Sequence, residues 1–309
     1  MIPNWLRGGT MLAATGMAWG GMFPVMKPLL AEIDPITLTL VRFGFSVPIL
    51  IALLVSLEGY KALRMKGRLL RLWWLGTLGF TGFGVLLVFG LKATRPEHGA
   101  VVPALMPLIT VAVVAIRTRI WPAAQALAAV AMAIAGVVLI VTHGDPSALL
   151  NSDAGRGEAL ILLGATCWVF YTLGAAEFRA WSALRYTTLT CALGVSSLAV
   201  LECIAVKAGV VALPTPTKLI GAAPDLAYLV LVASVMGLLF WNAGMQAVGP
   251  ARGVLFINLV PVTAFAIAVL GGRVPGGAEI AGVALVISGL VLNSFQPTAR
   301  AVRDDRSGI

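Results

Sequence analysis

Long apolar runs separated by short polar stretches extend over almost the whole chain. A helix needs about 20 apolar residues to cross the hydrocarbon core of a bilayer. Runs of about this length, bounded by charged residues, glycine and proline, recur at regular intervals. They predict ten membrane-spanning helices, at residues 9–30, 35–57, 72–91, 96–116, 121–141, 158–177, 186–207, 225–247, 253–270 and 278–296.

Composition supports an all-α integral membrane protein. The 309 residues are 59% hydrophobic and only 11% charged, whereas a soluble domain carries roughly 25% charged residues. The net charge of +9 is compatible with nucleic-acid binding. However, the basic residues fall in the short loops between apolar runs, where they encode membrane orientation. We therefore expect the lipid bilayer, and not nucleic acid, to be the surrounding partner.

The distribution of lysine and arginine predicts the topology. One side of the membrane receives Arg7, Lys61, Arg64, Lys66, Arg68, Arg71, Arg117, Arg119, Arg179, Arg185, Arg252, Arg300, Arg303 and Arg306. The other side receives only Lys92, Arg95, Arg156, Lys207, Lys218 and Arg273. Cytoplasmic loops carry the excess of basic residues. We therefore expect both termini in the cytoplasm and the protein in the plasma (inner) membrane.

The two halves of the chain resemble each other. Residues 93–120 align with 247–274 at a constant offset of 154, which pairs Pro107 with Pro261, and an offset of 149 pairs Trp19 with Trp168. Each half, 1–147 and 148–309, contains five predicted spans. Because five is odd, the second half enters the membrane from the opposite side, and the repeats are inverted. Inverted repeats are typical of secondary transporters, whose substrate site lies near mid-membrane between the halves.

These residues resemble the EamA-like branch of the drug/metabolite transporter superfamily, over nearly the whole chain. The resemblance rests on Trp19-Gly20, Lys27, Pro35, Arg42-Phe43 and the Leu-X-Pro triplets at 105–107 and 259–261. It implies a central cavity lined by helices 1, 3, 4, 6, 8 and 9, and export or exchange of metabolites, amino acids or drugs. The YddG-type aromatic amino-acid exporters look most similar. The family's Gly-Glu after helices 4 and 9 is absent here, where Arg119 and Gly272-Arg273 stand.

The residue types within the predicted spans indicate a substrate site. Glycine and proline in a span allow close approach and a kink, and intramembrane aromatic residues suit flat apolar ligands. The predicted substrate-binding residues are Trp19, Gly20, Phe23, Arg42, Phe83, Pro107, Trp168, Tyr171, Trp241 and Asn258. The predicted gating residues are Pro24, Lys27, Pro103 and Pro261. The alternative is ordinary helix packing with structural kinks.

Arg42 is the most informative of these residues, because an ionisable side chain within a span is a functional candidate by default. It either binds a substrate carboxylate, locks an outer gate, or tethers a helix to backbone carbonyls. Lys27 lies closer to a span end and either gates or extends to the headgroups. Glu177 and Glu202 lie near span ends, which favours exchange or facilitated diffusion over obligatory proton coupling.

Other chemistries find little support. Cys167, Cys191 and Cys203 form no CxxC pair, and the two histidines are far apart in sequence, so we expect no metal, no cofactor and no enzymatic activity. The sequence therefore predicts a secondary transporter that exports small organic metabolites by alternating access, with aromatic or apolar amino acids as substrates. A carrier of another substrate class, an integral membrane enzyme and a channel are the alternatives. No oligomeric state is predicted.

Overall fold

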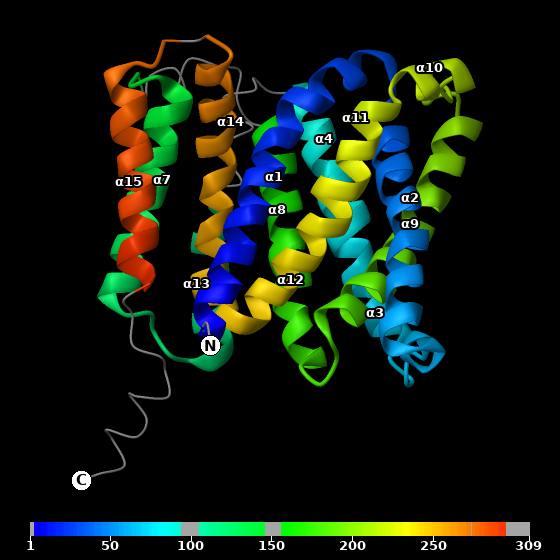
Figure 1. Cartoon of the computed structure of the whole chain (residues 1–309), viewed down its shortest axis with the longest axis horizontal. Coiled ribbons are helices and arrows are strands. Elements are labelled where there is room, and N and C mark those ends of the chain that lie inside the picture. The colour runs from blue at the N-terminus through cyan, green and yellow to red at the C-terminus, as the bar shows by residue number, and fades with distance from the viewer. Residues whose placement is uncertain (1–2, 94–104, 146–155, 273, 295–309) are drawn as a thin grey trace.

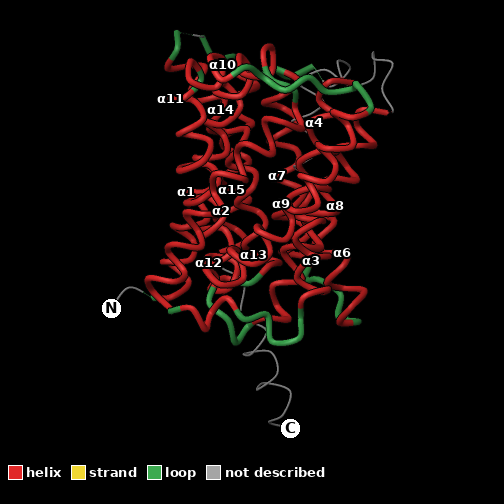
Figure 2. The backbone as a smooth tube through the Cα atoms, turned by 90° about the vertical axis from the view of Figure 1, so that its right-hand side faces the viewer, coloured by secondary structure: helices red, strands yellow, loops and turns green. Residues whose placement is uncertain are grey.

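The protein is a bundle of helices that run between two ends of the molecule, with the loops gathered at those ends (Figures 1 and 2). The computed structural model describes residues 3–93, 105–145, 156–272 and 274–294. Within these ranges every regular element is helical and there is no strand. The predicted all-α fold is therefore confirmed for the described part of the chain.

Helices occur in each of the first five predicted spans. The first two are α1 (Asn4–Glu32) and α2 (Pro35–Glu58), followed by a short 3₁₀ helix, η1 (Tyr60–Leu63). The third span combines α3 (Leu69–Gly76), the π-helical η2 (Thr77–Gly82) and α4 (Phe83–Ala93). The last two contain α6 (Met106–Thr118) and α7 (Ala124–Thr142).

The second half follows a similar order. It begins with α8 (Arg156–Gly174), the 3₁₀ helix η5 (Ala175–Phe178) and α9 (Ala183–Lys207). After α10 (Pro216–Gly221), a continuous helical stretch combines α11 (Ala223–Ala227), the π-helical η6 (Tyr228–Met236) and α12 (Gly237–Val248). The chain continues through α13 (Pro250–Gly253), the 3₁₀ helix η7 (Val254–Asn258), α14 (Leu259–Leu270) and α15 (Gly277–Ser294).

Six of these helical stretches are long and apolar enough to cross a membrane. They are Pro35–Glu58, Leu69–Gly90, Ala159–Phe178, Ala183–Lys207, Ala223–Val248 and Pro250–Leu270. Three further apolar helices, Met106–Thr118, Ala124–Ile140 and Gly277–Leu292, are shorter. This pattern is that of a multi-pass membrane protein.

Local sequence explains where the helices begin and end. The Asp34 side chain accepts a hydrogen bond from the Ile36 N–H and caps α2, and Pro35 occupies the first turn, where no N–H donor is needed. Gly59 ends α2 with φ +78°, a conformation that glycine adopts without strain. Ser182 caps α9 by accepting from the Arg185 N–H.

Four helix pairs pack closely against each other in the bundle. Here α1 packs on α12, α4 on α8, α2 on α9 and α7 on α15. Glycines permit the close approaches: a Cβ on Gly136 would lie 2.5 Å from the Gly282 carbonyl oxygen, and one on Gly76 would meet the backbone of Thr190. Small residues at such contacts are the usual means of packing helices in a membrane, where no hydrophobic effect drives helices together.

Candidate substrate site

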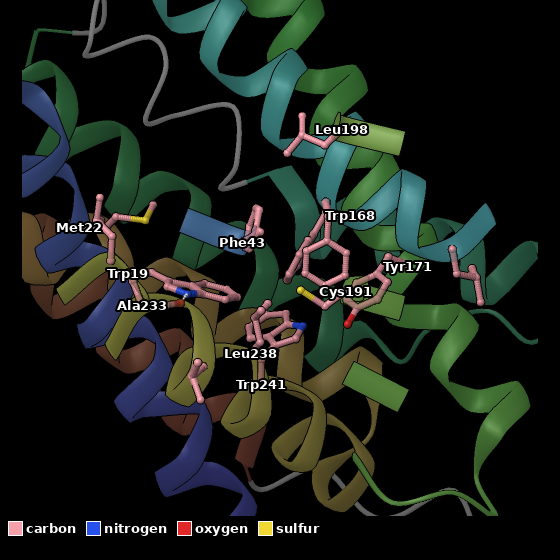
Figure 3. Close-up of a cluster of buried hydrophobic side chains, with 14 of the residues drawn as sticks. Trp19, Met22, Phe43, Trp168, Tyr171, Cys191, Leu198, Ala233, Leu238 and Trp241 are labelled. Carbon is pink, nitrogen blue, oxygen red and sulfur yellow. Dashed lines mark hydrogen bonds between the residues drawn. The ribbon is translucent and has the colours of Figure 1, made fainter. Parts of the chain in front are cut away.

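An aromatic cluster lies where α1, α8 and α12 meet (Figure 3). The Trp19 ring centroid is 5.5 Å from that of Trp168 and 5.2 Å from that of Trp241. Trp168 lies 5.1 Å from both Phe83 and Tyr171. Except for the partly buried Phe83, all of these rings are buried. The structure thus brings together five of the predicted site residues, from helices in both halves of the chain.

The three indole N–H groups of this cluster differ in their partners. Trp19 Nε1 donates to the Ala233 carbonyl oxygen at 2.8 Å, and Trp241 Nε1 donates to Thr172 Oγ1 at 3.2 Å. Trp168 Nε1 is buried and has no hydrogen-bond partner in the described part of the chain. A buried donor without an acceptor is unfavourable. The Trp168 N–H is therefore a donor available to an acceptor within the cluster.

The π-helical turn of η6 explains why the Ala233 carbonyl is available. Gly237 N–H donates to the Val232 carbonyl, five residues earlier, and also to the Ser234 carbonyl, and the α-helix α12 begins at that point. Where bonds from residue i to i−5 give way to bonds from i to i−4, one carbonyl is skipped, here that of Ala233. The skipped oxygen is the acceptor for Trp19.

Arg42 reaches the same carbonyl from α2. Its Nε donates to Ser234 Oγ at 2.6 Å, and one of its terminal nitrogens lies 3.4 Å from the Ala233 oxygen. The guanidinium also lies 4.8 Å from the centroid of the Phe43 ring. Within the described residues no carboxylate contacts Arg42, and its neighbouring ionisable groups are the thiol of Cys191 and the phenol of Tyr228. The tether to a backbone carbonyl is therefore present, while the cation has no anionic partner from the described chain.

A second polar group, which is not among the predicted site residues, borders the cluster. Asn242 Nδ2 donates to the Tyr171 hydroxyl at 2.9 Å and to Thr187 Oγ1 at 2.8 Å. The Asn242 side-chain oxygen is buried and has no partner among the described residues. The available signal was a single asparagine within an apolar run, two residues after Phe240.

Gly20 lies in a helix-packing contact. A Cβ on Gly20 would come within 2.5 Å of Thr263 Cβ and 2.6 Å of the Val260 carbonyl oxygen, both on α14. Gly16, one turn earlier, similarly faces Leu259. Gly20 therefore allows α1 to approach α14 closely, as the helix-packing alternative expects, while its neighbour Trp19 faces η6.

The remaining predicted residues lie along the surrounding helices. Pro107 is buried in the first turn of α6, and Pro261 lies in the first turn of α14, directly after η7. Asn258 is fully buried at the end of η7, and its amide donates to the Leu255 carbonyl at 3.1 Å. Pro24 is exposed on α1. Pro103 and the side chains of Phe23 and Lys27 lie outside the described residues.

Glu202, predicted only to lie near a span end, is buried between two helices. It is only 4% exposed on α9, and one of its oxygens accepts a hydrogen bond from the Thr37 hydroxyl of α2. Its second oxygen has no partner in the described ranges. Position along the apolar run suggested an end, but the packing of α2 on α9 covers it.

Comparisons with known proteins agree on the family. The profile of the EamA-like transporter family matches residues 6–142 and again residues 155–295. The chain is 30% identical over 283 residues to the uncharacterized transporter YrdR of Bacillus subtilis, covering 90% of this chain and 88% of the relative. It is 29% identical to the uncharacterized transporter YyaM of the same organism, covering 92% of each.

A solved crystal structure shares the fold, with a TM-score of 0.74 at 20% identity, over 94% of this chain and 96% of the other. The fold, the multi-pass helices and the double match over most of the chain lead to one conclusion. The chain belongs to the EamA-like transporter family and is a multi-pass membrane transporter rather than an enzyme.

Proposed function

We propose that the protein exports amino acids with aromatic or apolar side chains by alternating access across the plasma (inner) membrane. The observation that carries this proposal is the pairing of Arg42, a cation with no carboxylate partner among the described residues, with the aromatic cluster through the Ala233 carbonyl. A guanidinium binds a carboxylate through two parallel hydrogen bonds. The aromatic rings suit the side chain of the same ligand.

The architecture that we propose is ten spans in two inverted repeats, 1–147 and 148–309. The family profile matches once in each half. In Figure 1, α1 rises from the end marked N, whereas α8 runs in the opposite direction. The packing of α1 on α12 has a counterpart in the packing of α8 on α4. These observations support the repeat, and they favour cytoplasmic placement of both termini together with the basic residues of the loops.

The substrate site that we propose comprises Arg42 for the carboxylate and the rings of Trp19, Phe83, Trp168, Tyr171 and Trp241 for the side chain. The rings contact one another. Substrate entry therefore requires that they separate, which a rocking motion of one half against the other provides. Asn258 on η7 and Pro107 on α6 complete the proposed wall.

Prolines near the site are proposed as gate positions. Pro24 lacks the N–H that would bond to the Gly20 carbonyl, and Pro261 lacks the one for Ile257. Such breaks let a helix bend without losing further hydrogen bonds. Pro103 and Lys27 are assigned to the gates on their sequence positions alone.

Counterflow in proteoliposomes tests the proposed function. Vesicles loaded with an unlabelled amino acid are diluted into medium with the same labelled amino acid, using a panel of aromatic, aliphatic, acidic and basic types. We expect saturable accumulation driven by the internal pool for aromatic and aliphatic members. Linear, non-saturable flux indicates a channel, and counterflow confined to the charged members or absent from the whole panel contradicts the amino-acid proposal.

A further inference from the structure

Each half of the chain contains one skipped carbonyl, at corresponding positions. In η2, Phe83 N–H donates to the Leu78 carbonyl five residues earlier, and α4 begins at Phe83. The same geometry that frees Ala233 in η6 therefore frees Gly79 in η2. Gly79 and Ala233 are 154 positions apart, the offset that also pairs Pro107 with Pro261.

The tryptophans on the helices that pack against these two turns correspond as well, but only one of them donates a hydrogen bond to a skipped carbonyl. Trp19 and Trp168 are matched by the repeat, and Trp19 donates to Ala233. Within the described part of the chain, Trp168 Nε1 has no hydrogen-bond partner. The Tyr171 ring covers the turn at Gly79, since a Cβ on Gly79 would lie 2.6 Å from Tyr171 Cγ.

We propose that these two indole–carbonyl hydrogen bonds alternate during transport: Trp19 binds Ala233 in the present conformation, and Trp168 binds Gly79 in the opposite one. The proposal rests on the inverted repeat of the proposed function. Each bond joins the two halves, because Trp19 and Gly79 belong to the first half and Ala233 and Trp168 to the second. When the halves exchange conformations, one bond forms as the other breaks.

The exchange explains the unpaired donor of the present conformation. Trp168 lies on α8, which packs on η2, one turn before Tyr171 on the same helix. Its ring already contacts Tyr171 at 5.1 Å. Departure of the Tyr171 ring from the Gly79 turn makes room for the Trp168 indole to approach the skipped carbonyl. Each of the two states then has one indole N–H that is hydrogen-bonded to a skipped carbonyl. Neither state is therefore strongly favoured over the other.

Spin-label distance measurements on the full-length protein in lipid nanodiscs test this inference. One label pair, at Leu70 and Ala180, reports the end of the molecule at which α3 begins. A second pair, at Ala31 and Pro224, reports the opposite end, and all four positions are exposed. The repeat relates the pairs, because Leu70 corresponds to Pro224 at offset 154 and Ala180 to Ala31 at offset 149. The measurements are made without substrate, so they do not depend on the amino-acid proposal.

The two tryptophans are replaced separately by phenylalanine, which keeps a ring and removes the donor. Trp19→Phe is expected to move the population ratio of the two states about three- to tenfold toward the opposite conformation, the effect of one net hydrogen bond. Trp168→Phe is expected to move it by a similar factor the other way.

Trp181→Phe is the control. It removes an indole N–H from a ring that packs on Phe178 of the same half, outside the proposed substrate site, and we expect it to move the ratio in neither direction. Size-exclusion profiles and melting temperatures establish that each variant is folded. Shifts in the same direction for Trp19→Phe and Trp168→Phe, or unchanged distances in both folded variants, overturn the alternation.

Discussion

Trp19 and Arg42 donate to the same carbonyl oxygen, that of Ala233, at 2.8 and 3.4 Å. One comes from α1 and the other from α2, and the oxygen belongs to the π-helical turn η6. A single skipped carbonyl thus joins the cation to the edge of the aromatic cluster. A ligand with a carboxylate next to a ring meets both groups at this point.

Truncation of Trp19 tests whether the cluster contacts substrate. Trp19→Ala removes a buried ring and is expected to lower the free energy of unfolding by about 3–5 kcal/mol. In the protein that folds, the added space is expected to raise uptake of bulky relative to small amino acids. Thermal unfolding and uptake of several substrates are measured together. Trp73→Ala, on the exposed face of α3, is the control. If the substrate preference of Trp19→Ala is the same as that of the wild type, Trp19 contributes to packing alone.

The contact of Gly20 with α14 predicts that alanine substitution changes protein stability differently at Gly20 and at Gly44. Gly20→Ala places a methyl group against Thr263 and Val260 and is expected to lower the free energy of unfolding by about 1–3 kcal/mol. Gly44→Ala is the matched control in α2, because nothing lies within 4 Å of its added Cβ. It is expected to raise stability by roughly 0.5–1 kcal/mol. Melting in detergent measures both, and equal melting temperatures would falsify the packing role of Gly20.

The buried hydrogen bond between Thr37 of α2 and Glu202 of α9 predicts that the stability of the fold depends on a donor to this carboxylate. Thr37→Val removes the only described donor to Glu202 and is expected to cost about 1–3 kcal/mol of unfolding free energy. Glu202→Gln keeps an acceptor oxygen and is expected to remain within about 1 kcal/mol of wild type. The double variant Thr37→Val with Glu202→Leu replaces the polar pair by apolar groups and should recover most of the loss. If chemical unfolding gives Thr37→Val the same unfolding free energy as the wild type, the hydrogen bond between Thr37 and Glu202 does not stabilise the fold.

The bias of basic residues predicts the topology. A reporter fused after Ile309 is expected to report the cytoplasm, because the loops on that side carry most of the arginines and lysines. A reporter inserted between α9 and α10 is the control and is expected to report the opposite side. Cytoplasmic activity of the second fusion, or external activity of the first, contradicts the proposed orientation.

Much of the fold was predictable because the hydrophobic pattern decides where a chain can lie in a membrane. All ten predicted ranges contain described helix. The exposed Trp5, Trp74 and Trp121, at 59%, 51% and 87%, suit the aromatic belt that membrane proteins place at the interface. Trp19, Trp168 and Trp241 cluster, as expected for aromatic residues on the helices that the family resemblance places around a central cavity.

The finer features were not predictable from pattern, because they depend on backbone register and on tertiary contacts. No residue preference distinguishes the π-helical turns η2 and η6 from the α-helix around them, so the role of the Ala233 carbonyl was not foreseen. The close approach of α14 to Gly20 depends on how two distant helices pack, which the local sequence does not specify. Glu202 lies near a helix end in sequence but is covered by α2 in three dimensions.

Transport of a matched substrate pair tests the central claim most directly. Uptake of an aromatic amino acid is compared with uptake of its decarboxylated amine, in wild type and in Arg42→Lys, in the same proteoliposomes. A hydrogen-bonded charge is worth about 1.5–3 kcal/mol, so the wild type should transport the amino acid roughly 10- to 100-fold more efficiently than the amine. Arg42→Lys keeps the charge but loses the two-pronged geometry, and it should reduce this ratio severalfold while the amine is unaffected. Equal transport of the amino acid and the amine by the wild type would contradict the account.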